Sequence, residues 1–116
     1  MARYQHLPIY KTGYALLGLV VRVTKEFPRE YKFTLGQRLR DEVIEVLVLV
    51  YRANSRTDKA SVLAEILERV LVIELLIRLC HDLKILARKH YAGLAEITES
   101  LARQTEGWKK SAAKLV

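Results

Sequence analysis

Apolar residues recur every three to four positions along most of the chain, in four segments separated by three short breaks. The first segment covers residues 8–27, the second 34–53, the third 59–82 and the fourth 87–114. This spacing places the apolar residues of each segment on one side of a helix. Because short connections join antiparallel neighbours, the pattern predicts an all-α, up-down-up-down antiparallel four-helix bundle that forms one domain over residues 1–116.

Local residues mark the ends of these helices. Pro28 disfavours helix at the residue before it, Thr34 is predicted to cap the second helix, and either Thr57 or Asp58 is predicted to cap the third. The middle of the second segment, residues 43–51, is rich in β-branched side chains and resembles a buried strand. The helical pattern of the preceding residues continues into it without a break, so we expect helix there as well.

The third segment is apolar on more sides than a single bundle needs. Between Val70 and Leu79 the only charged residues are Glu74 and Arg78, and the middle of the second segment is similarly apolar. Such helices bury one face inside their own bundle and another face elsewhere. The pattern therefore predicts a homo-oligomer held mainly by apolar faces of the second and third helices.

The net charge of +7 suggests a polyanionic partner or an acidic protein surface. In the predicted topology the first and third turns share one end of the bundle, where many basic residues gather. A nucleic acid would suit this end, because each neutralised phosphate releases counterions; the alternative is that these side chains only solvate the loops. The predicted nucleic-acid-binding residues are Lys25, Arg29, Lys32, Arg38, Arg40, Arg78, Lys84, Arg88 and Lys89.

No catalytic, metal-binding or cofactor-binding pattern stands out, so we expect a protein that is not an enzyme and needs neither metal nor other cofactor. Glu42, Glu65 and Glu96 are each followed three residues later by glutamate, whereas a di-iron bundle has histidine at that spacing. The tyrosines are scattered along the sequence, which predicts no base-stacking platform. The single cysteine, Cys80, and the single tryptophan, Trp108, are both expected in the core.

The apolar stretches are all far shorter than the ~20 residues that span a bilayer. The first residues also lack the apolar core of a signal peptide. A cytoplasmic protein is therefore expected.

Three stretches of the chain match the pattern of a known family. They are Phe27-Pro-Arg-Glu-Tyr-Lys-Phe-Thr-Leu-Gly-Gln-Arg-Leu, then Leu76-Ile-Arg-Leu-Cys-His-Asp-Leu-Lys-Ile-Leu followed by Tyr91, and finally Gly107-Trp108. The pairing of Phe-Pro-Arg with Thr-Leu-Gly is the most specific of these features. Together with the helix spacing, the chain resembles the accessory variability determinant (Avd) proteins of diversity-generating retroelements over nearly its whole length.

The resemblance implies a bundle that assembles as a barrel-like homopentamer and uses a basic surface to bind RNA or DNA and a retroelement reverse transcriptase. With that partner, the family supports mutagenic cDNA synthesis from a template-repeat RNA without being the polymerase. The four-helix-bundle proteins encoded in intervening sequences of 23S ribosomal RNA genes share the fold. They imply the alternative function, that of a structural or protein-interaction oligomer.

Some positions follow the family pattern and others depart from it. Among the basic residues, Arg29, Lys32, Arg38 and Arg78 fall where the family pattern is basic. Glu74 stands where a basic residue is expected, and its spacing favours an ion pair with Arg78, which would mute part of the basic surface. Gln37 also departs from the family pattern, in which an acidic residue is usual at this position.

Overall fold

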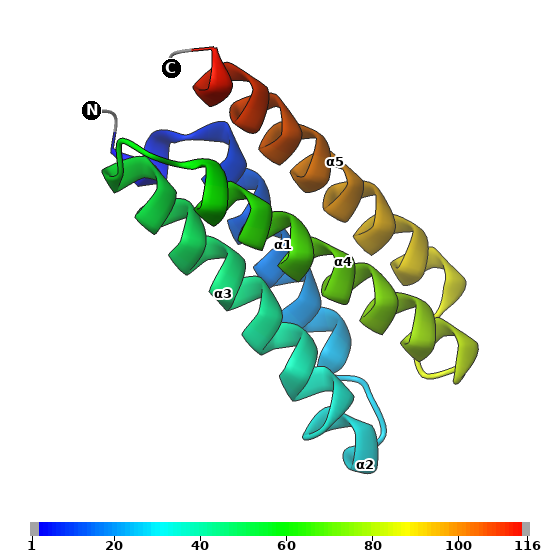
Figure 1. The fold of residues 1–116 in the computed structure, drawn as a ribbon. Coiled ribbons are helices and arrows are strands. Elements are labelled where there is room, and N and C mark those ends of the chain that lie inside the picture. Colours follow the sequence, from blue (N-terminus) through cyan, green and yellow to red (C-terminus); the bar gives the residue numbers. More distant parts are fainter. Residues whose placement is uncertain (1–2, 115–116) are drawn as a thin grey trace.

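The computed structural model describes residues 3–114, and within that range all regular structure is helical. The elements are a turn of 3₁₀ helix, η1 (Tyr4–His6), four long helices, α1 (Pro8–Thr24), α3 (Leu35–Ser55), α4 (Ala60–Asp82) and α5 (Arg88–Ala113), and one short helix, α2 (Arg29–Lys32). Successive long helices run antiparallel (Figure 1), which confirms the predicted all-α class and the up-down-up-down arrangement.

The four long helices surround one apolar core in the cyclic order α1, α3, α4, α5. Every long helix contributes to this core: Leu16, Leu49, Ile73 and Leu101 have no exposed surface. Burying a side chain of this kind stabilises the fold by about 1.5–3 kcal/mol. The bundle measures 47 × 20 × 19 Å. In the described part of the chain, we find no helix with the length and apolar character needed to cross a lipid bilayer.

The first corner of the bundle differs from the sequence prediction. α1 ends at Thr24, three residues before the predicted end, because the amides of Glu26 and Phe27 bond to carbonyls three residues back and tighten the chain. Phe27 then turns into the core. After Pro28, a single helical turn, α2, fills a segment that the sequence pattern left as a break.

Thr34 bonds within this corner, and Gly36 packs it against the end of α1. Thr34 occupies the N-cap position of α3, as predicted, but its hydroxyl donates to the carbonyl of Glu30 at 2.7 Å and caps no amide of α3. A Cβ at position 36 would lie 3.3 Å from both the Thr24 side chain and the Tyr31 carbonyl oxygen. The Thr-Leu-Gly motif therefore belongs to a tightly packed junction where only glycine fits without displacement.

Replacing Gly36 with alanine is expected to lower the free energy of unfolding by about 1 kcal/mol, because a backbone carbonyl cannot yield to the new methyl group. Gly18→Ala in α1 is the matched control. Its new Cβ would meet only the Arg22 guanidinium, at 3.5 Å, so the gain in helix propensity should raise stability by about 0.5–1 kcal/mol. Urea unfolding at a fixed protomer concentration measures both changes. Two shifts of the same sign would contradict the packing argument.

The start of α4 also differs from the prediction. Lys59 occupies the N-cap position of α4, which begins at Ala60. Of the two proposed caps, the Asp58 carboxylate accepts a hydrogen bond from the amide of Ala60 at 3.4 Å, whereas Thr57 makes no side-chain hydrogen bond within residues 3–114. The ammonium group of Lys59 donates to the carbonyl of Ala53 at 2.7 Å. A lysine from the turn thereby satisfies a carbonyl at the end of α3, where a cation also interacts favourably with the helix dipole.

Two core predictions concern single residues. Cys80 is fully buried, as predicted. Burial raises the pKa of its thiol to about 11, so the group stays protonated at neutral pH and is a poor nucleophile. Trp108 packs against the core while remaining partly exposed, and the Lys59 ammonium lies 5.9 Å from the centre of its ring.

Candidate nucleic-acid interface

The basic residues predicted from the sequence gather toward one end of the bundle. The corner that contains α2 and the turn between α4 and α5 lie at this end, which we call the basic end, and both chain termini lie at the opposite one (Figure 1). α1 ends here, α3 begins here, and the last turns of α4 meet the first turn of α5. These elements carry all nine predicted residues, namely Lys25, Arg29, Lys32, Arg38, Arg40, Arg78, Lys84, Arg88 and Lys89.

Two of the nine side chains already have hydrogen-bond partners in the bundle. Arg40 is half-buried and donates to the Thr24 hydroxyl at 2.7 Å and to the Lys32 carbonyl at 3.2 Å. Arg38 donates its Nε hydrogen to a buried carboxylate, that of Glu42, at 3.0 Å. Arg40 therefore fastens the corner to α1, Arg38 partners a buried carboxylate from the surface, and a phosphate would have to compete with partners already in place.

The other seven predicted cations have no side-chain hydrogen bond or ion pair within residues 3–114. Five of them are exposed at the corner and the third turn, Lys32 is half-buried, and Arg78 is exposed on α4. The expected ion pair between Glu74 and Arg78 does not form in this range, so that prediction is wrong and the Arg78 charge is not neutralised. The unpaired cations are Lys25, Arg29, Lys32, Arg78, Lys84, Arg88 and Lys89.

Lys84 occupies a backbone conformation that favours glycine. Its φ is 63°, in the left-handed region, and the amides of Lys84 and Ile85 bond to the carbonyls of His81 and Cys80. This is the Schellman arrangement that ends many helices, usually with glycine at that position. A lysine there costs on the order of 1 kcal/mol relative to glycine, and it places an additional cation at the basic end.

The structure adds Arg22 and His90 to the candidate surface. Both line a groove between the end of α1 and the start of α5, beside Glu26 and the apolar side chains of Leu19 and Ile85. Neither belongs to the predicted set, although both lie near the basic end by sequence. The first turn of α5 carries no acidic residue and its N-terminus has no side-chain cap, so its positive helix dipole adds to the positive potential.

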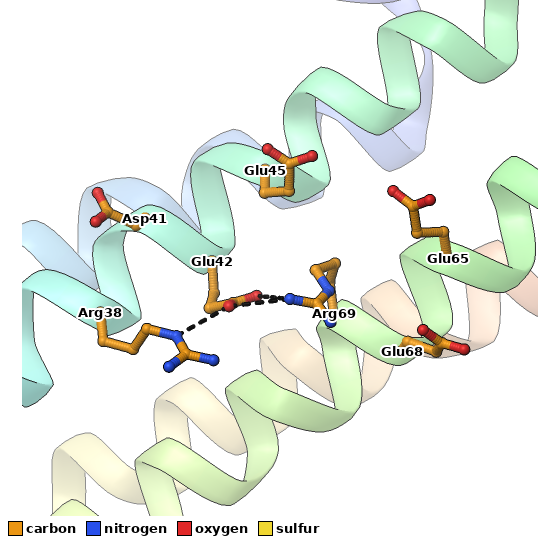
Figure 2. A pocket seen from close by; sticks show the side chains of 7 residues that line it. All are labelled: Arg38, Asp41, Glu42, Glu45, Glu65, Glu68 and Arg69. Atoms are coloured by element: carbon orange, nitrogen blue, oxygen red, sulfur yellow. Dashed lines mark hydrogen bonds and ion pairs between the residues drawn. The ribbon is translucent and has the colours of Figure 1, made fainter.

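An acidic groove lies between α3 and α4, in the middle of the bundle (Figure 2). Glu42 is buried and binds Arg69 of α4 with both carboxylate oxygens at 3.1 Å. Among residues 3–114, no group of three or more histidine, cysteine, aspartate or glutamate side chains is placed to hold a metal ion. This groove repels a phosphate backbone. The acidic residues around the central pair are Asp41, Glu45, Glu65 and Glu68.

The tyrosines are the clearest disagreement with the sequence analysis. Four of the six come together at the end that holds the termini: the Tyr4 ring lies 4.9 Å from Tyr51 and 5.3 Å from Tyr10, and Tyr10 stacks on Tyr14 at 6.1 Å between centroids. The prediction that they are scattered is wrong, because η1, α1 and α3 bring together residues nearly 50 positions apart. This aromatic surface lies away from the basic end.

Fold and site together define an all-helical four-helix-bundle protein whose exposed cations gather at its two ends. The sequence of such a bundle can be compared directly with known families. The model of the bAvd-like family matches residues 8–112, nearly the entire chain, and the protein therefore belongs to the bAvd-like family. No curated protein matches it.

Proposed function

We propose that the protein is a non-catalytic accessory factor of a diversity-generating retroelement. A homo-oligomer, a pentamer by analogy with the family, binds RNA or DNA through its basic ends and binds the reverse transcriptase. It thereby supports mutagenic cDNA synthesis from template-repeat RNA. The observation that carries the proposal is the set of seven unpaired cations at one end, in a chain that belongs to the bAvd-like family.

The backbone at Lys84 supports this proposal. A lysine in a conformation that favours glycine lowers stability without improving the packing of the core, and such local strain concentrates at functional sites. Its charge lies beside Arg88 and Lys89, where it can contribute to the neutralisation of phosphate groups. The alternative function, a structural or protein-interaction oligomer, is favoured by the large apolar side chains that remain exposed on α3 and α4. That function would need no cation at position 84.

Salt dependence tests the proposal. If the protein contacts about six phosphates, its affinity for single- or double-stranded nucleic acid should fall on the order of 1,000-fold when the salt concentration rises from about 50 to 200 mM. Replacing Lys84 with glycine should reduce the steepness of that dependence, because one cation is lost per copy. The same variant should unfold at an equal or higher urea concentration, since glycine relieves the backbone. Absence of binding at low salt would favour the structural alternative.

A further inference from the structure

One side of the bundle carries a continuous exposed apolar surface made by α1 and α3. We call it the tyrosine face and define it as Tyr10, Tyr14, Ile44, Val48 and Tyr51. Tyr14 and Tyr51 are 61% and 55% exposed, and Ile44 and Val48 are each more than 40% exposed. The side chains of both helices also line one shallow hollow. Most of this face lies toward the end of the bundle where α1 begins and α3 ends.

A second exposed apolar surface lies on α4. We call it the leucine face and define it as Leu71, Leu75 and Leu79, which are 55%, 58% and 43% exposed. Their four-residue spacing aligns them in a single stripe. A groove beside the stripe is completed by Tyr91 and Ala95 of α5 and also contains the charged side chains of Glu74, Arg78 and Glu99. The leucine face lies in the half of the bundle that holds the turn between α4 and α5.

The two faces lie on different sides of the bundle, since the cyclic helix order sets the α1–α3 side opposite the α4–α5 side. Several large side chains that are about half exposed lie on each face, so each face presents a surface on the order of a few hundred Å². Surfaces of this size on a small protein usually mark sites of protein association. Aliphatic side chains such as Ile44 and Val48 among the tyrosines fit a protein partner better than nucleotide bases.

We propose that the tyrosine face of one copy packs against the leucine face of a second copy. The inference rests on the homo-oligomer of the proposed function and assigns its contact surfaces. A contact between two unlike faces uses each face once, and when it repeats around a ring it covers every exposed face. A contact of either face with itself would leave the other face exposed to water.

The charges at the ends of the two faces support this pairing. Arg52 and Asp41 bound the tyrosine face, 11 residues apart on α3, and Glu68 and Arg78 bound the leucine face, 10 residues apart on α4. At 1.5 Å per residue these separations are about 16 and 15 Å. When two copies lie in the same orientation and one is displaced along the bundle by about 12–14 Å, Arg52 meets Glu68 and Asp41 meets Arg78. The same orientation brings all the basic ends to one side of the assembly.

Two variants test the assignment. Val48→Glu places a charge in the tyrosine face and Leu75→Glu places one in the leucine face; both positions are exposed, so each chain should keep its helical circular dichroism. Light scattering at micromolar concentration should show that each variant alone is a monomer. An equimolar mixture should form a one-to-one dimer, because one partner retains an intact tyrosine face and the other an intact leucine face. Thr57→Glu, in the turn between α3 and α4, is the control and should assemble as the wild type does.

The alternatives give different masses. If either variant alone keeps the wild-type mass, or if the mixture remains monomeric, the proposed pairing is wrong. If one variant alone forms a dimer, a face packs against itself, and the proposal is equally wrong. Nucleic-acid binding is measured separately, so monomeric variants that still bind RNA at low salt would leave the proposed function standing.

Discussion

A variant carrying glutamate at Arg29, Lys32, Arg88 and Lys89 is expected to bind nucleic acid on the order of 100- to 1,000-fold more weakly at about 0.1 M salt. Each phosphate contact adds counterion release to the binding free energy, and four such contacts account for a loss of this size. The fold should survive, since these four side chains have no partner within the described residues. Glutamate in the first turn of α5 even suits the helix dipole there.

The matched control reverses four cations at the opposite end: Lys11, Arg56, Lys110 and Lys114, all exposed. Both variants change the net charge equally, so total charge cannot explain a difference between them. Fluorescence anisotropy with a labelled RNA and a labelled DNA of equal length would give the two affinities. Equal losses would mean that the basic end has no special role and that only net charge attracts the nucleic acid.

Arg69→Ala is expected to lower the free energy of unfolding by about 3 kcal/mol. The Glu42 carboxylate is buried, and without Arg69 its only remaining ion-pair partner within residues 3–114 is Arg38, which is largely exposed. A buried charge that loses its main partner is strongly destabilising. Arg38→Ala should cost no more than about 1 kcal/mol, because an exposed pair contributes little.

A double variant separates the charge effect from the loss of packing. Replacing both Glu42 and Arg69 with leucine removes the buried charge together with its partner, so stability should return to near the wild-type value. Urea unfolding at a fixed protomer concentration is the measurement, since assembly adds to the apparent stability. A double variant as unstable as Arg69→Ala would show that the cost comes from lost side-chain packing.

The helical periodicity predicted the four long helices because the core residues follow it closely. Leu39, Val43, Val46 and Val50 are all buried on one side of α3. The capping residues in the sequence predicted the ends of the helices less well than the apolar spacing predicted their middles. Of the two predicted caps of α4, only Asp58 bonds to an amide of the helix, that of Ala60, and α2 is too short to produce an apolar period.

The candidate site was predictable in composition but not in geometry. That the basic residues share one end follows from the antiparallel topology. That Arg40 reaches back to Thr24 depends on how the corner folds over α1, which no spacing in the sequence records. The tyrosine contacts were missed for the same reason: Tyr4 and Tyr51 meet only after α1 and α3 have packed.

The ion pair between Glu42 and Arg69 shows which residues of α3 and α4 lie at the same level, and therefore how far apart the two apolar faces lie along the bundle. By this register Leu75 is level with residue 36, about 12 residues or 18 Å from Val48. If the copies form the proposed closed ring, they cannot rise at every contact, so each bundle would have to be inclined to the ring axis. For bundles about 20 Å wide, a displacement of this size corresponds to an inclination of about 40° to the ring axis. In such a ring all the bundles would be inclined in the same direction. A nucleic-acid strand that follows the edge of the ring would then contact the same side of each copy in turn.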